Sequence, residues 1–348
     1  MSKLKSFLFA SLLIVLITPF VVTPVSAQQN TSNFDVTVSP VFFDLSAKPG
    51  TAVSGKVRLR NNTTSPLPIK VEVKKLGGDE NGELTIQNTA DDTNSWFEVK
   101  TPTFSAPPAE WTTVPFIITV PSTAAYGYYW ALSFTQDAND DKTVTGAKIN
   151  ASIVVPVLLN VSKEGAKTEG KISEFKTDMN WYEYLPVDFA TTFANTGNVH
   201  VRPRGNIFIK DSLGRSVATL DINPNQGAVL PGTKKEFVTS WNDSFAWYEN
   251  KMVDGKSVIG KNGKPVRELK MRFDKILDLR IGKYTASSLV VISDGQRDIA
   301  IEKSITFFVF PWKGVIGAVI FILFALLGLV STAKNIGKKI STLFKRSK

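Results

Sequence analysis

The chain has 348 residues with no cysteine and one histidine, and its formal net charge is +10. The missing cysteines exclude a disulfide framework, a thiolate metal site and a Cys nucleophile, and the single histidine excludes multi-histidine zinc sites. Nine of the 41 basic residues lie in 1–27 and 313–348, so the body between them, with 32 basic and 31 acidic residues, is nearly neutral and gives no electrostatic reason to expect nucleic-acid binding.

Residues 1–27 have the pattern of a secretory signal peptide. Lys3 and Lys5 form its basic region, Phe7 to Ile17 its apolar region, and Val25-Ser26-Ala27 a cleavage site of small residues. We therefore expect the mature chain to begin near Gln28, outside the cytoplasm. An exported chain without cysteine is typical of bacteria.

Alternation of apolar and polar residues predicts a first β domain in 28–162. Ile69, Val71 and Val73, for example, alternate with charged residues. The other expected strands are Phe34 to Val38, Lys56 to Arg60, Val114 to Val120, Tyr128 to Phe134 and Ile149 to Val161. About seven short strands separated by turn clusters indicate an immunoglobulin-like β-sandwich.

The densest aromatic cluster runs from Tyr126 to Leu132. In a strand, Tyr128 and Trp130 share one face and Tyr129 takes the other. Core packing explains the first face, which leaves Tyr129 as a candidate for a recognition surface. The nearby run Asp137 to Asp141 lacks the glycine and the final glutamate of a known calcium loop, so we expect a solvated hairpin tip and no metal site.

A polar, glycine-containing linker is predicted at 163–171, followed by a second sandwich domain in 172–312. Its expected strands are Val187 to Phe193, Ile207 to Lys210, Val217 to Ile222, Phe237 to Trp241, Leu277 to Ile281, Tyr284 to Ile292 and Ile299 to Phe310. Two turns match between the halves: Lys48-Pro49-Gly50-Thr51 with Leu230-Pro231-Gly232-Thr233, and Asn61-Asn62-Thr63-Thr64 with Asn195-Thr196-Gly197-Asn198. The second domain is therefore predicted to repeat the first.

The connection from Trp241 to Leu277 is too long for a tight sandwich turn and contains a hairpin signal at Lys261-Asn262-Gly263-Lys264. It carries Trp247, Tyr248 and Lys251, which could stack on a sugar ring or anchor a partner protein. Alternatively, these aromatic residues cover the open end of the second core. His200, beside Arg202 and Arg204, is expected to be a surface side chain.

Residues 313–334 are predicted to form one transmembrane helix, because Gly314 to Ala333 is a run of 20 residues without a charge. Trp312 precedes it, and a basic tail at 335–348 follows. This charge pattern predicts a single-pass protein of the cell membrane with its body outside and its C-terminus in the cytoplasm. The predicted fold is all-β: two tandem immunoglobulin-like β-sandwiches followed by a single transmembrane helix.

No nucleophile elbow, phosphate-binding glycine loop or dinucleotide fingerprint occurs in the sequence. We therefore predict no catalytic residues and no cofactor. A pair of carboxylates on any fold could support glycoside hydrolysis, so a carbohydrate-active enzyme is a third, minor alternative.

The order of these parts resembles the WxL-interacting proteins of Gram-positive cell surfaces. The residues that carry the resemblance are Val38-Ser39-Pro40, Lys48-Pro49-Gly50, Val57 to Asn62, Pro121 to Phe134, Gly282-Lys283-Tyr284-Thr285 and Phe308 to Lys313. The resemblance implies a first domain that binds peptidoglycan and a second that binds a partner or host protein.

The leading hypothesis is a non-enzymatic, membrane-anchored surface protein that binds peptidoglycan, another envelope polymer or a partner surface protein. The alternative is a structural or chaperone-like subunit of an envelope complex, which would use exposed sheet edges for strand addition.

Overall fold

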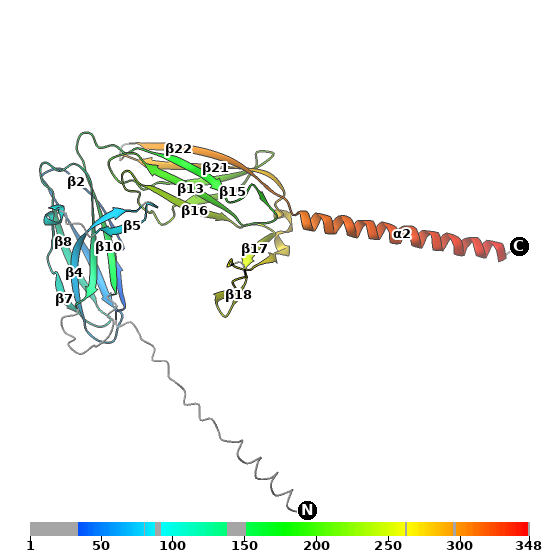
Figure 1. Ribbon diagram of the computed structural model, residues 1–348, viewed down its shortest axis with the longest axis horizontal. Helices are drawn as coiled ribbons and strands as arrows, with labels where there is room; N and C mark the ends of the chain where they lie inside the picture. Colours follow the sequence, from blue (N-terminus) through cyan, green and yellow to red (C-terminus); the bar gives the residue numbers. More distant parts are fainter. Residues whose placement is uncertain are drawn as a thin grey trace, which may run out of the picture. The chain divides into compact units, whose positions relative to one another are not determined.

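The computed structural model describes residues 34–79, 81–87, 92–137, 151–261, 263–294 and 297–346 (Figure 1). The predicted signal peptide and, apart from Asp137, the predicted hairpin tip lie outside these residues. The described chain forms two β-sandwiches in tandem, followed by the apolar helix α2 (Trp312–Arg346). The predicted fold class is confirmed.

The first sandwich packs a four-stranded sheet against a six-stranded one. The smaller sheet has the order β1 (Val36–Ser39), β3 (Ala52–Asn61), β8 (Trp111–Thr119), β6 (Phe97–Val99). The larger sheet has the order β2 (Phe43–Ala47), β10 (Ser152–Val161), β9 (Tyr126–Gln136), β4 (Leu67–Gly78), β5 (Leu84–Gln87), and β7 (Thr103–Ala106) also pairs with β4. A short 3₁₀ helix, η1 (Asp92–Trp96), leads into β6. The pairing of β2 with β10 is parallel.

The first core follows from the predicted alternation. Val114, Phe116 and Ile118 of β8 are buried while the residues between them are less so. Trp130 is fully buried, and its ring lies 5.6 Å from that of Phe97, edge to face. Burying a large apolar side chain stabilises the folded state by about 1.5 to 3 kcal/mol. The two sheets therefore pack with the apolar face of one against the apolar face of the other.

The second sandwich repeats this strand order. Its three-stranded sheet has the order β11 (Gly170–Thr177), β13 (Val187–Asn195), β16 (Lys234–Trp241). Its five-stranded sheet has the order β12 (Trp181–Tyr182), β22 (Asp298–Val309), β21 (Gly282–Ser293), β14 (Arg204–Asp211), β15 (Ser216–Ile222). As in the first sandwich, the short strand β12 pairs in parallel with the last strand, β22. Trp241 and Phe307 are fully buried in its core.

A buried asparagine closes the same turn in each sandwich. Asn61, at the end of β3, donates through its side-chain amide to the carbonyl oxygens of Ser65 and Ala106 at 2.8 and 2.9 Å. Asn195, at the end of β13, donates in the same way to Val199 and Val229, also at 2.8 and 2.9 Å. The predicted correspondence of the two asparagine turns is therefore confirmed, and this pair of hydrogen bonds recurs in both sandwiches.

The predicted match of the two Pro-Gly turns is wrong in register. The Gly232 amide donates to the Asn195 carbonyl, and its counterpart in the first sandwich is Ala109, whose amide donates to the Asn61 carbonyl. Both residues have a positive φ, 73° for Gly232 and 59° for Ala109. Alanine seldom adopts this conformation. The turn before β8 has Ala109 where the turn before β16 has Gly232, so it lacks the Pro-Gly sequence by which a turn is recognised.

Residues 242–281, between β16 and β21, form an insertion that the first sandwich replaces with a short turn. It contains the ribbon of β17 (Ala246–Asn250) with β20 (Arg267–Met271), the small ribbon of β18 (Met252–Val253) with β19 (Lys256–Ser257), and the 3₁₀ helix η3 (Phe273–Asp278). Asn262 of the predicted hairpin turn lies outside the described residues; around it, the Gly260 amide donates to the Lys264 carbonyl and Ile259 bridges to Pro265, as a hairpin requires. We call this insertion the foot.

The strand predicted at Leu277 to Ile281 is wrong. Leu277 lies in η3 and is 97% exposed, and the next strand begins only at Gly282. The alternating apolar residues that suggested a strand meet no partner strand, so their side chains remain in contact with solvent.

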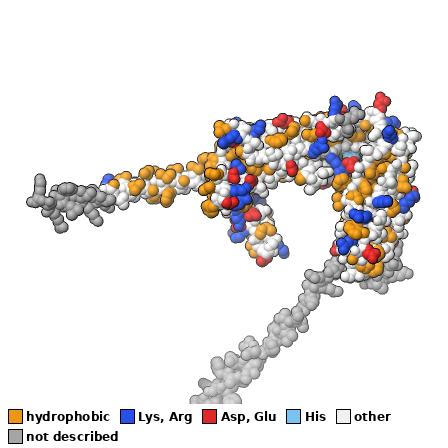
Figure 2. All heavy atoms as spheres, turned by 180° about the vertical axis from the view of Figure 1, so that it is seen from behind, with side chains coloured by type: hydrophobic (Ala, Val, Ile, Leu, Met, Phe, Trp, Pro, Cys, Tyr) orange, Lys and Arg blue, Asp and Glu red, His pale blue; other side chains and the backbone are white. Residues whose placement is uncertain are grey.

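The segment Trp312–Lys334 of α2 is 23 residues long and apolar enough to cross a membrane. Hydrophobic side chains cover the face of this segment drawn in Figure 2. The helix does not stop at the end of the apolar run but continues through the basic residues to Arg346.

Replacing Asn195 with alanine is expected to lower the free energy of unfolding of the second sandwich by about 2 to 3 kcal/mol. The substitution leaves two buried carbonyl groups without their donor, and an unsatisfied buried polar group costs about 1 to 3 kcal/mol. Urea unfolding, monitored by the fluorescence of Trp241 in the second core, measures the loss. Asn206→Ala removes only an exposed side-chain bond to Asp221 and should change stability by less than about 0.5 kcal/mol; equal losses in the two variants would refute this account of the turn.

Candidate functional site

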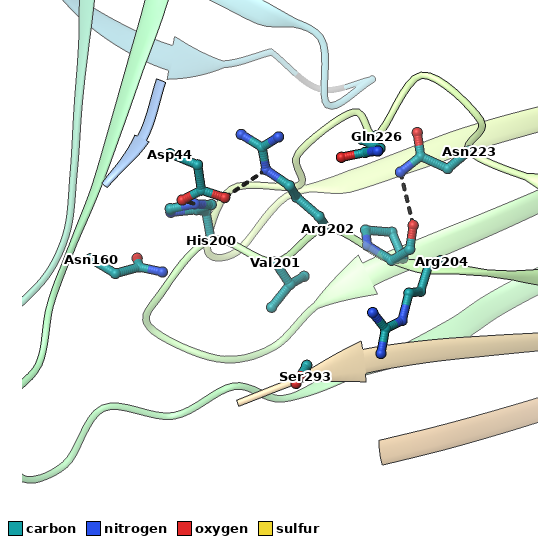
Figure 3. A pocket seen from close by; sticks show the side chains of 10 residues that line it. Asp44, Asn160, His200, Val201, Arg202, Arg204, Asn223, Gln226 and Ser293 are labelled. Carbon is teal, nitrogen blue, oxygen red and sulfur yellow. Dashed lines mark hydrogen bonds and ion pairs between the residues drawn. The ribbon is translucent and has the colours of Figure 1, made fainter. Parts of the chain in front are cut away.

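The strongest polar cluster in the described structure joins the two sandwiches. Asp44 on β2 accepts a hydrogen bond from His200 Nε2 at 2.9 Å, and its other carboxylate oxygen lies 2.9 Å from Arg202 Nε (Figure 3). His200 and Arg202 lie in an extended segment after β13, where alternation puts them on one side and sends Val201 into the second core. A residue of the first sandwich thus holds two residues of the second.

The His200 side chain is only 2% exposed, which corrects the expectation that it lies on the surface. Its ring packs edge-on against Tyr129, with 5.6 Å between the ring centroids. The guanidinium of Arg202 lies 4.0 Å from the ring of Phe42, a cation–π contact. Both basic side chains are therefore covered by aromatic groups of the first sandwich.

Opposing effects set the protonation of Asp44. Burial alone would raise the pKa of its carboxyl group, but the hydrogen bond and electrostatic interaction with His200 and the positive charge of Arg202 outweigh burial and lower the pKa below the ordinary 3.8. Asp44 is therefore ionised near neutral pH; it accepts the hydrogen bond from His200 and forms an ion pair with Arg202.

An apolar cluster continues the contact between the sandwiches. Leu76, Ala131 and Leu158 of the first pack with Ala228 and Leu230 of the second, and all five are buried. Such side chains would be exposed to water if the sandwiches separated. The contact therefore resembles a small hydrophobic core rather than a polar domain interface.

Backbone groups approach closely at the same contact. A side chain on Gly82 would place its Cβ 2.1 Å from the carbonyl oxygen of Lys234, and Gly82 has a φ of +74°. Beside it, the Lys235 ammonium lies 3.2 Å from the Glu83 carboxylate. Only glycine fits position 82 without moving one of the two chains.

The linker is fixed by hydrogen bonds. The amide of Lys167 donates to the Asn198 side chain at 2.7 Å, and the Asn198 side chain donates to the Gly165 carbonyl at 2.9 Å. The amides of Thr196 and Gly197 donate to the Glu169 carbonyl. The predicted linker, 163–171, whose last two residues belong to β11, is thus tied to the asparagine turn of the second sandwich.

A cavity of about 410 Å³ lies beside the Asp44 cluster. Most of the residues that line it have polar side chains: the first sandwich contributes Asp44 and Asn160, and the second contributes His200, Arg202, Arg204, Asn223 and Gln226 (Figure 3). Asn223 has a structural task, since its amide donates to the Pro203 and Gly227 carbonyls. Arg204 is 66% exposed and pairs with Asp298 at the rim, where it can meet a ligand.

The four residues predicted to form a recognition surface occupy two places. Tyr129 packs on His200 at the contact between the sandwiches, and burial raises the pKa of its hydroxyl group. Trp247, Tyr248 and Lys251 belong to the foot. In the described part of the chain, Tyr129 thus lies at the contact between the sandwiches and the other three lie in the foot, so the four do not form one surface.

Within the foot, the three predicted residues point to different surroundings. Trp247 packs against the second core and stacks under Arg272, 5.2 Å from the ring centroid, which supports the alternative of core capping for this residue. Tyr248, on the other face of β17, donates its hydroxyl hydrogen to Glu183 at 3.0 Å. Lys251 is exposed, and its backbone pairs with Val258 and Val266.

Sequence reasoning missed Asp44 and the burial of His200. The alternation His200-Val201-Arg202 indicates two polar side chains on one face, but no local pattern distinguishes Asp44 from the other acidic residues. Their meeting depends on how the two sandwiches contact each other.

No protein-family model matches the sequence, and no curated protein matches it. Solved structures that are similar include the class 5 fimbriae chaperone CfaA, with 11% identity over 77% of this chain and 99% of that chain and a TM-score of 0.38. Others are the Pseudomonas aeruginosa CupB2 chaperone (10% identity, 77% and 100% covered, TM-score 0.35) and the E. coli chaperone DraB (9%, 78% and 98%, 0.33). These TM-scores are below 0.5. It is the strand order of the chain itself that shows the sandwich architecture.

Replacing Asp44 with asparagine is expected to lower stability by about 1 kcal/mol at pH 7, because it removes a charge-assisted bond from a partly exposed cluster. The pKa of Asp44 is lowered in the folded chain, so its contribution is present above pH 3.8 and is lost as the pH falls through the lowered pKa. Thermal unfolding of both proteins from pH 7 to pH 3 measures the difference. A gap between them that stays constant below pH 3.8 would contradict this role.

Tyr129→Ala is expected to lower the free energy of unfolding by about 2 kcal/mol, because it opens a cavity beside His200. Tyr129→Phe keeps the ring and should retain most of the stability. Urea unfolding compares the variants. If Tyr129 served only a ligand, Tyr129→Ala would leave the unfolding curve unchanged.

Proposed function

We propose that this chain is a membrane-anchored, non-enzymatic surface protein that binds an envelope polymer, peptidoglycan, at the cavity between its two sandwiches. The observation that carries the proposal is the polar cavity with the Arg204 guanidinium at its rim. The resemblance to WxL-interacting proteins supports the same class of ligand.

The chemistry of the cavity suits a polymer with hydroxyl and carboxylate groups. Side-chain amides of Asn160 and Gln226 offer both donors and acceptors, which match sugar hydroxyl groups. Arginine presents a planar fork of donors that pairs with carboxylates such as those of a stem peptide. Because residues of both sandwiches line the cavity, binding there requires the two domains in contact.

Anchoring by α2 is part of the proposal. Its apolar segment is long enough to span a bilayer, and its side chains have no protein covering in the described structure. The basic residues after it favour a cytoplasmic C-terminus, which places both sandwiches outside the cell.

The absence of catalysis is also a proposal. It is supported by the position of the only histidine, whose ring is held by Asp44 and Tyr129 at the contact between the sandwiches. His200 lines the cavity, but its Nε2 atom is engaged by Asp44 and its side chain is only 2% exposed, so it is poorly placed to take a proton from a substrate.

A chaperone-like or structural subunit is the second candidate, and one observation favours it. Strand β16 ends the order of its three-stranded sheet, and Val238 on it is 62% exposed. An apolar side chain on an edge strand can receive a strand of another chain. A photo-crosslinker at position 238 in intact cells would then trap unfolded client chains.

Full-length chain in detergent is expected to sediment with purified peptidoglycan, and Arg204→Gln is expected to weaken binding about tenfold, as for the loss of one charged hydrogen bond. The matched control is Arg215→Gln: Arg215 is similarly exposed and also pairs with an aspartate, but it lies outside the cavity. Absence of sedimentation, or equal weakening by both variants, would overturn the assignment of the cavity.

A further inference from the structure

The foot exposes an unusual amount of apolar surface. Among its described residues only Ser244 and Ala246 are buried. Three apolar side chains of η3 point into solvent, with Phe273 74%, Ile276 58% and Leu277 97% exposed. Large exposed apolar side chains outside the foot and α2 are few and scattered, so this concentration indicates a surface that something covers.

Short contacts connect the foot to the start of α2. The Tyr248 amide donates to the Leu185 carbonyl at 2.7 Å, and its hydroxyl donates to Glu183. The same Glu183 carboxylate oxygen accepts from the Lys313 ammonium at 2.7 Å. One carboxylate therefore joins the foot to the first turn of the apolar helix.

The 3₁₀ helix η3 is held to the same ribbon. The Phe245 amide donates to the Asp278 carbonyl, and the Arg272 amide donates to the Phe245 carbonyl. The Asp243 carboxylate pairs with Arg272 at 2.9 Å and with Lys275 at 2.5 Å. These bonds hold both ends of η3 to the ribbon, while its apolar side chains Phe273, Ile276 and Leu277 remain exposed.

Aromatic side chains suited to a membrane interface surround the start of α2. Trp312 is 50% exposed and Trp181 is 61% exposed, and the Trp181 ring stacks on Phe308 at 4.4 Å. Trp181, Trp312 and Tyr248 line a mainly apolar hollow of about 390 Å³ together with Arg267. Tryptophan and tyrosine collect at the level of lipid headgroups, where one side of the ring is apolar and the other meets water.

Charge adds to the same pattern. Residues 242–281 contain nine basic and six acidic residues, mixed with eleven exposed large apolar side chains. Figure 2 shows charged and hydrophobic side chains side by side next to the start of α2. Apolar side chains that enter a bilayer boundary, flanked by basic side chains that meet phosphates, are the features of interfacial membrane binding.

We infer that the foot binds the lipid bilayer beside α2, with Phe273, Ile276 and Leu277 inserted at the boundary between headgroups and acyl chains. This rests on the anchoring of α2 that the proposed function includes. The foot then gives the second sandwich a second attachment to the membrane and restricts its rotation about the single helix. Lipid is favoured over a protein partner because Tyr248 and Arg267 of the foot line the same hollow as Trp312, the first residue of the apolar helix.

The chain has no cysteine, so a single introduced one can be labelled without side reactions. Full-length Leu277→Cys, carrying an environment-sensitive fluorophore, is reconstituted into vesicles of phosphatidylglycerol and phosphatidylethanolamine. The label is expected to shift its emission to shorter wavelength and to be quenched by lipids that carry a spin label at the headgroup or upper acyl chain. Val41→Cys is the control, an exposed apolar position in the first sandwich, and its label is expected to keep its aqueous spectrum and escape quenching.

The remaining outcomes separate the two proposals. If the chain does not float with the vesicles, the anchoring by α2 is refuted and the inference falls with it. If the chain floats but the label at 277 stays aqueous, only the membrane contact of the foot is refuted. An emission shift without quenching by the spin-labelled lipids, growing with the amount of protein per vesicle, would show that a second copy covers η3 and would also overturn the inference.

Discussion

The contact between the two sandwiches depends on two basic side chains of the second sandwich that are removed from most of their water: those of His200 and Arg202 are 2% and 17% exposed. Taking polar and charged groups out of water costs several kcal/mol unless partners replace the lost hydration. Both side chains find this replacement at Asp44 of the first sandwich, so they are paired only when the two domains meet in one register. Apolar packing around Leu158 and Leu230 supplies burial, and the polar cluster selects the position in which that burial occurs.

This division of tasks explains why the cavity lies where it does. Residues that bind the sandwiches together also form its walls, and amide side chains such as Asn223 are fixed by backbone carbonyls rather than by a ligand. A preformed polar wall lowers the ordering cost of binding. The same cluster that holds the domains in contact would therefore hold a binding site ready.

The two sandwiches share one strand order, and the second differs from the first mainly by the foot, the insertion at 242–281. The strand order recurs in both sandwiches, and in each a buried asparagine at the end of a strand of the smaller sheet donates to the carbonyl of a neighbouring segment. The foot has no counterpart in the first sandwich and lacks a core of its own. Its apolar side chains are exposed in the described structure, and this exposure is the reason for our inference that the bilayer covers them.

The sequence alone determined the features that depend on local pattern. Alternation located most strands, the turn residues revealed the repeat, and the uncharged run of 20 residues located α2. It failed where a local pattern had no partner, as at Leu277, and where an unusual backbone carried an ordinary residue, as at Ala109. Only the tertiary structure decided that His200 is buried, that Asp44 is its partner 156 residues away, and that Tyr129 faces the second sandwich. These facts depend on which surfaces of two folded domains meet, and no periodicity within either domain encodes that choice.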